Sequence, residues 1–154
     1  MPKAKLTLNE RIARALMLGL QQKIPGIPTI PERCLQFVRV GVEYAIGLEP
    51  RGFYRLIQGV DSNPSARELE ALIRKNKPSW VVSSPKAGDL VWWTSCFEGD
   101  KYGHVGGLVK GLNGKLWVAQ NTTIAHGGID YPGNLRLVPL AEMQTPTMYS
   151  RIGG

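Results

Sequence analysis

The stretch YGHVGGLVKGLNGKLWVAQN, residues 102–121, decides the fold of this chain. Two β-type runs, 104–109 and 116–120, flank the pair Asn113-Gly114. Asn-Gly accepts the positive φ angles of a tight turn, so this pair predicts a two-residue hairpin between antiparallel strands. At the open end of that hairpin we expect His104 beside a residue near 120–121.

The rest of the sequence divides into a helical first half and a strand-rich second half. Apolar residues recur every three or four positions before residue 78, and capping-box pairs stand at Thr7/Glu10 and Ser65/Glu68. The predicted helices cover about 8–23, Pro31 to Gly47, about 51–58, and Ser65 to about Lys75. Further strands are predicted at Leu90–Trp93, Leu135–Pro139 and 148–152. This order predicts an α+β fold, with N-terminal helices packed on a C-terminal antiparallel sheet of about four to six strands.

The length of 154 residues fits one domain, covering residues 1–154. Within it, residues 1–28 form the first helix and a Pro-rich connection. No apolar run reaches the ~18–20 residues that a membrane helix needs, so we expect no membrane span. The N-terminal residues lack the apolar core of a secretory signal, and we therefore expect synthesis in the cytoplasm without a signal peptide.

The chain is basic, with a formal net charge of +7. Such a charge attracts polyanions, namely nucleic acid, anionic membrane or anionic cell wall, although it also serves solubility alone. The basic residues are scattered, and neither a zinc-finger spacing nor a basic-aromatic RNA motif is present. We therefore expect no nucleic-acid partner.

Cys34 is the first candidate for chemistry, because it falls in the first turn of the helix that starts near Pro31. A helix N-terminus stabilises a thiolate, and its N–H groups can hold the oxyanion of a tetrahedral intermediate. The alternative is a small buried core residue. The second cysteine, Cys96, follows a β-type run and is interpreted as structural, and two cysteines do not make a disulfide scaffold.

A nucleophilic thiol needs a base and a group that orients the base. His104 is the candidate base, and Gln120 and Asn121 on the next strand are the candidate orienting groups. Asn121 is alternatively a turn former at the strand end. The other histidine, His126, is interpreted as a surface-loop residue, and the cysteines and histidines lack a metal-ligand spacing.

Four motifs in one order resemble the CHAP family of cysteine- and histidine-dependent amidohydrolases and peptidases, which belongs to the papain-like superfamily. They lie within about residues 31–123 and comprise Cys34-Leu35-Gln36-Phe37-Val38, Gly88-Asp89-Leu90-Val91-Trp92, Gly103-His104-Val105-Gly106 and Val118-Ala119-Gln120-Asn121. Many members carry Glu two residues before the Asn, where this chain has Ala119. The orienting role therefore passes to Asn121 or to Gln120.

The resemblance implies a peptidoglycan hydrolase, either an N-acetylmuramoyl-L-alanine amidase or an endopeptidase, with catalytic Cys34, His104 and Asn121 or Gln120. It implies a thioester intermediate and no metal or cofactor. The expected setting is a phage or prophage lysin or a tail-associated protein, which reaches the bacterial cell wall through a holin, a virion or a delivery machine. Two alternatives remain open: a papain-like peptidase, deamidase or acyltransferase that acts on a protein as a delivered toxin, and a phage tail assembly protein with a weak or relict site.

Overall fold

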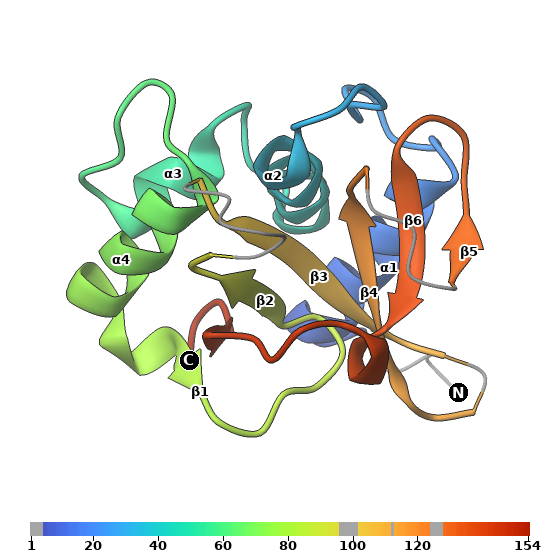
Figure 1. Cartoon of the computed structure of the whole chain (residues 1–154). Coiled ribbons are helices and arrows are strands. Elements are labelled where there is room, and N and C mark those ends of the chain that lie inside the picture. Colours follow the sequence, from blue (N-terminus) through green and yellow to red (C-terminus); the bar gives the residue numbers. More distant parts are fainter. Residues whose placement is uncertain (1–4, 96–101, 112, 124–127) are drawn as a thin grey trace.

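Helices form the first half of the chain and strands the second half, as predicted (Figure 1). The computed structural model describes residues 5–95, 102–111, 113–123 and 128–154. Within these ranges the elements are α1 (Leu8–Leu20), α2 (Cys34–Ile46), α3 (Gly52–Ile57), α4 (Ala66–Asn76), η1 (Pro78–Trp80), β1 (Val81–Val82), β2 (Leu90–Trp93), β3 (His104–Lys110), β4 (Leu116–Asn121), β5 (Ile129–Asp130), β6 (Leu135–Pro139), η2 (Leu140–Glu142) and β7 (Met148–Ser150).

The strands form one antiparallel sheet in the order β1-β7-β2-β3-β4-β6-β5. The described residues contain seven strands, so the expectation of four to six was too low. The additional strands β1 and β5 have two residues each, which is too short for an alternating pattern to reveal them. The α+β class itself is confirmed.

Several element ends differ from the predicted ones. The first helix ends at Leu20 rather than near residue 23, because the chain turns at Gln22, which has a φ of 56°. The second helix begins at Cys34 and not near Pro31, since Glu32 has a φ of 64°, outside the helical region. The last strand ends at Ser150, two residues short of the predicted end.

The hairpin of β3 and β4 exists, but its turn is not the predicted two-residue turn. The strand pairing ends at Lys110 with Leu116, and the backbone N–H of Gly111 donates to the carbonyl of Lys115 at 2.8 Å. The loop therefore spans residues 111–115, of which Leu112 lies outside the described residues. The register that results pairs Gly107 with Ala119.

The helices cover one face of this sheet. Figure 1 shows α1 behind β3 and β4, and the apolar residues of α1 and α2 meet the inward residues of these strands in the main core. Gly107 permits this close packing, because a Cβ atom there would lie 2.2 Å from Cδ1 of Leu16. No helix in the described ranges is both long and apolar enough to cross a membrane.

The opposite face carries a smaller apolar cluster. It consists of Val91, Trp93, Leu108 and Val118, and Leu140 and Met143 from the segment after β6 pack against it. This segment crosses in front of the sheet in Figure 1. Residues at even positions of β3 therefore face this cluster, whereas the odd positions Val105 and Val109 face the helices.

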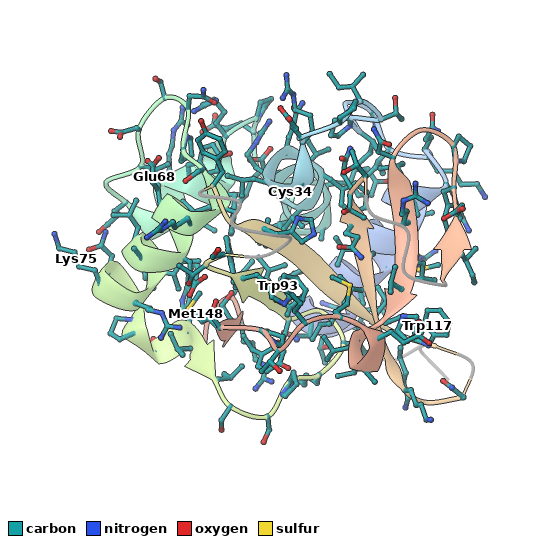
Figure 2. All side chains as sticks on the ribbon, in the orientation of Figure 1. Cys34, Glu68, Lys75, Trp93, Trp117 and Met148 are labelled. Atoms are coloured by element: carbon teal, nitrogen blue, oxygen red, sulfur yellow. The ribbon has the colours of Figure 1, made fainter. Side chains whose placement is uncertain are left out.

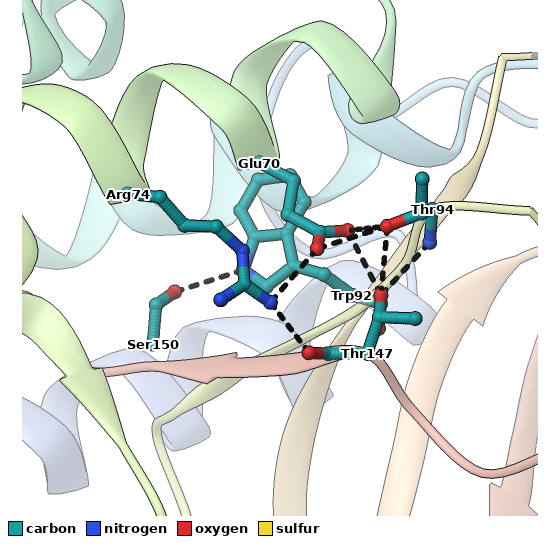
Figure 3. Close-up of polar contacts among 6 residues, drawn as sticks. All are labelled: Glu70, Arg74, Trp92, Thr94, Thr147 and Ser150. Carbon is teal, nitrogen blue, oxygen red and sulfur yellow. Dashed lines mark hydrogen bonds and ion pairs between the residues drawn. The ribbon is translucent and has the colours of Figure 1, made fainter.

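A buried carboxylate fixes α4 against the sheet (Figure 3). Glu70 is only 3% exposed and accepts hydrogen bonds from the hydroxyls of Thr94 and Thr147, each at 3.0 Å. Arg74 lies one turn further along α4 and adds an ion pair to the same carboxylate at 3.2 Å. The network joins α4 to the chain after β2 and to the chain before β7.

A second buried carboxylate, Asp89, ties the C-terminus to the rest of the domain. Asp89 is fully buried and accepts from both Nε and Nη2 of Arg151, at 2.8 and 2.7 Å, and from the amide of Asn9 on α1 at 2.8 Å. These hydrogen bonds to Asp89 raise the pKa of Arg151 above its ordinary value. Asp89 also accepts from the N–H of Lys86 at 2.8 Å, which fixes the turn that leads into β2.

The Asp89 contact predicts the effect of truncating Arg151. We expect Arg151→Ala to lower the free energy of unfolding by about 2–3 kcal/mol, because it leaves a buried carboxylate without its charged partner; the solvent access of Arg151 keeps the loss below that of a fully buried pair. The matched control is Arg55→Ala, which removes an exposed ion pair with Glu49 and is expected to cost no more than about 0.5 kcal/mol. Urea unfolding measures both values, and equal losses would contradict the assignment.

Candidate active site

Cys34 is the first residue of α2, and its side chain is half-buried (Figure 2). The helix has no side-chain cap: Arg33 at the N-cap makes no hydrogen bond to the first turn, whereas Thr7 and Ser65 cap α1 and α4. The positive end of the helix dipole and the first-turn N–H groups therefore lie beside the thiol without a capping side chain. Cys34 is present as a thiol and not in a disulfide.

His104 begins β3, and backbone contacts of the two residues before it hold it in place. The preceding Gly103 has a φ of +72°, and a Cβ atom there would lie 2.7 Å from the carbonyl oxygen of Trp93. The carbonyl of Tyr102 accepts from the N–H of Arg67 in the first turn of α4 at 2.9 Å. The loop before the imidazole is thus fastened to α4, which the Glu70 network fixes in turn.

Gln120 is the residue that orients His104. The Nε2 atom of His104 lies 2.7 Å from Oε1 of Gln120, and both side chains are buried. The opposite end of the Gln120 amide contacts Sδ of Met143 at 3.5 Å, which matches an NH₂ group facing sulfur and an oxygen facing the ring. An amide oxygen only accepts, so Nε2 carries the proton in the neutral ring and Nδ1 is the basic nitrogen.

Asn121 has a different partner, because it faces the other side of the sheet. Its amide donates to the carbonyls of Pro28 and Ile30, at 3.0 and 3.1 Å, and its buried oxygen has no hydrogen-bond partner within the described residues. The amide therefore fixes the chain that leads into Cys34. Asn121 thus positions the segment before Cys34, and the described hydrogen bonds do not place it on the imidazole.

The register of the hairpin explains this choice between the two amides. A two-residue turn centred on Asn113-Gly114 would have placed His104 on the same face as Asn121. The longer loop over 111–115 shifts the pairing by one residue, and His104 shares its face with Gln120 instead.

Trp93 shields the imidazole. It is paired with His104 across β2 and β3, and the two ring centroids lie 5.5 Å apart. The indole is 1% exposed, and its N–H donates to the carbonyl of Gln144 at 2.9 Å. Because it excludes water from the side of the ring, Trp93 strengthens the hydrogen bond between His104 and Gln120.

Cys34, His104 and Asn121 line one cleft of about 710 Å³. The cleft lies between the start of α2, the loop before α4, and the ends of β3 and β4 where the hairpin opens. Such a volume accommodates a short peptide or a sugar-sized group. Gln120 lies behind His104 and does not reach the cleft wall.

A cationic and aromatic wall faces this site. Tyr54 contributes its ring, and the guanidinium carbons of Arg39 and Arg51 lie 5.6 and 5.0 Å from the ring centroid. Burial raises the pKa of Tyr54 above its ordinary value, although the nearby Arg39 and Arg51 oppose this shift. The phenol is therefore protonated at neutral pH.

Sequence reasoning missed Arg39, Arg51, Tyr54 and Trp93 as site residues. Trp93 was detectable only through the pairing of β2 with β3, which no local pattern specifies. The wall residues come from α2 and α3, and only their packing brings them to the cleft. Cys96, predicted to be structural, and His126, predicted to lie in a surface loop, are outside the described residues.

The described part of the chain contains no group of three His, Cys, Asp or Glu side chains that could hold a metal ion. The chemistry that this arrangement offers is that of a thiol at a helix N-terminus, with an oriented imidazole in the same cleft. Comparison with protein-family models, with curated proteins and with solved structures gives no match to this chain.

The contact between His104 and Gln120 predicts the tautomer of the imidazole. In a Cys34→Ala protein, where no thiolate partner is present, we expect the neutral ring of His104 to carry its proton on Nε2. Gln120→Leu removes the acceptor and should mix the two tautomers, whereas Asn121→Ser should leave the ring unchanged. The ¹⁵N chemical shifts of the imidazole distinguish these states, and a response to Asn121 rather than to Gln120 would contradict the assignment.

Proposed function

We propose that this protein is a cysteine hydrolase that cuts amide bonds in bacterial peptidoglycan, as an N-acetylmuramoyl-L-alanine amidase or an endopeptidase. The observation that carries the proposal is that Cys34 at an uncapped helix start and the Gln120-oriented His104 line the same cleft. A thiol, a base and an orienting group are the parts that nucleophilic catalysis needs.

The proposed reaction has two halves. His104 accepts the Cys34 proton at Nδ1, and the thiolate attacks the carbonyl carbon of the scissile amide. N–H groups at the start of α2 hold the oxyanion, the C–N bond breaks, and the imidazolium gives its proton to the leaving amine. A water molecule, deprotonated by His104, then hydrolyses the thioester and returns the thiol.

The amide side chain of Gln120 limits how strongly the site stabilises a charged imidazole. It fixes the ring by a hydrogen bond but carries no charge to stabilise an imidazolium, unlike the carboxylate that many CHAP proteins place near this point. Burial beside Trp93 strengthens the hydrogen bond that holds the neutral ring, but it does not replace the missing charge. We propose Cys34, His104 and Gln120 as the catalytic unit.

The substrate class rests on the four ordered CHAP-like motifs and on the net charge of +7, which favours association with an anionic wall. The CHAP-type variant of the papain-like fold is likewise a proposal, as is delivery to the wall by a holin, a virion or a secretion machine. The second candidate, cleavage or deamidation of a protein by a delivered toxin, uses the same site. A tail assembly role with a relict site is the third.

Purified sacculi test the reaction directly. We expect the wild-type protein to release soluble fragments, and both Cys34→Ala and His104→Ala to release none while their circular dichroism spectra stay those of the wild type. Mass spectrometry of the fragments separates amidase from endopeptidase cleavage. Release by Cys34→Ala would overturn the proposed mechanism, and release of nothing from walls of several chemotypes would favour a protein substrate.

Thiol reactivity separates an active site from a relict one. In a Cys96→Ser background, the rate of alkylation by iodoacetamide should rise with pH around a midpoint below the ordinary thiol value of about 8.5, because His104 and the start of α2 stabilise the thiolate. His104→Ala should move that midpoint upward. An ordinary midpoint that does not respond to His104→Ala would favour the assembly role.

A further inference from the structure

Arg51 and Glu32 are the two side-chain-bearing residues of the cleft wall that have a positive φ. The backbone of Arg51 has a φ of 69°, in the left-handed region that side-chain-bearing residues seldom adopt, and it stands at the N-cap of α3. Arg51 makes no side-chain cap for that helix. Its carbonyl accepts from the N–H of Tyr54 at 3.1 Å, so this backbone conformation starts α3 and leaves the side chain available to the cleft.

The guanidinium of Arg51 is held by two contacts. Its Nη2 donates to the carbonyl of Ser62 at 2.5 Å, across the loop before α4. Its plane lies near the ring of Tyr54, with 5.0 Å between the guanidinium carbon and the ring centroid. A guanidinium has five N–H donors in a fixed fork, so these contacts orient the group and leave most of its donors unused by the described hydrogen bonds.

The side chain of Arg51 is exposed and forms no ion pair within the described part of the chain, although the exposed Asp61 lines a neighbouring pocket with it. Its neighbour Arg39 forms an ion pair with the buried Glu43 at 2.7 Å, whereas no described ion pair includes Arg51. The acidic residues of the cleft wall, Glu32 and Glu68, are exposed, and Glu68 belongs to the cap of α4 with Ser65. An oriented cation thus lines the same cleft as Cys34.

We infer that Arg51 binds a carboxylate of the peptide substrate, with Tyr54 and the paired Arg39 as the rigid support behind it. The inference rests on the proposed function and narrows its substrate class. The preferred peptide carries a free carboxylate near the scissile amide, and a neutral bridge peptide or an amidated stem peptide is a poorer substrate. A planar guanidinium fork fits a carboxylate by two parallel charge-assisted hydrogen bonds, and a carboxamide cannot replace this pairing.

Binding to the Cys34→Ala protein tests the inference without turnover. The probes are a peptidoglycan stem peptide with free carboxylates and the same peptide with those groups amidated, measured by isothermal titration calorimetry. We expect amidation to weaken binding roughly ten- to hundredfold. A second pair of probes is a capped Glu-containing L-peptide and its Gln counterpart. This pair shows whether the carboxylate that binds belongs to peptidoglycan or to a protein.

Two variants test whether Arg51 is responsible for the preference for a carboxylate over an amide. Arg51→Gln should remove the preference for the carboxylate, and Arg51→Lys should keep part of it, because it retains the charge but not the fork. The matched control is Arg14→Gln, which makes the same charge change on the exposed side of α1 and should leave the preference intact. Thermal melting of each variant verifies that it is folded.

The outcomes separate this inference from the proposed function. Equal binding of each pair, absence of binding, or a preference that survives Arg51→Gln overturns the inference. Cys34-dependent cleavage of sacculi alongside such a result leaves the proposed function standing. An Arg51-dependent preference seen only with the L-peptides supports the carboxylate site and overturns peptidoglycan as the substrate.

Discussion

The register between β3 and β4 is the constraint on which the site depends. Side chains alternate between the two faces of a sheet, so a shift of one residue would exchange the helix-facing and outward-facing sets. The loop over 111–115 sets this register, and it places His104, Trp93 and Gln120 on one face. The opposite face receives Ala119 and Asn121, together with the main core.

The cleft walls come from distant parts of the chain, and two buried carboxylates hold the domain around them. Glu70 fixes α4 to the segments beside β2 and β7, and through the contact between Arg67 and Tyr102 it also supports the loop before His104. Asp89 joins α1 to the C-terminal Arg151. A buried carboxylate is costly unless it is paired, so each of these partners must be in place for the native structure to be stable.

The sequence predicted most of the elements, and it singled out Cys34 and His104, which line one cleft, because these features depend on local patterns. Helical periodicity and capping boxes identified α1 and α4, and the position of Cys34 before an apolar helix identified its dipole environment. The predicted register of β3 and β4 was wrong by one residue, because Asn113-Gly114 indicates a turn but does not fix its length. This difference of one residue determines that Gln120, and not Asn121, shares a face of the sheet with His104. The wall of Arg39, Arg51 and Tyr54 arises from the packing of α3 beside α2, and no local pattern predicts such packing.

The side-chain amides of the neighbouring residues Gln120 and Asn121 position different groups. One holds the imidazole, and the other holds the chain that enters Cys34 through the carbonyls of Pro28 and Ile30. Both groups are therefore attached to the same peptide unit at the end of β4. The thiol and the ring thus share one mechanical support, the end of β4, and the contact between Tyr102 and Arg67 extends that support to α4.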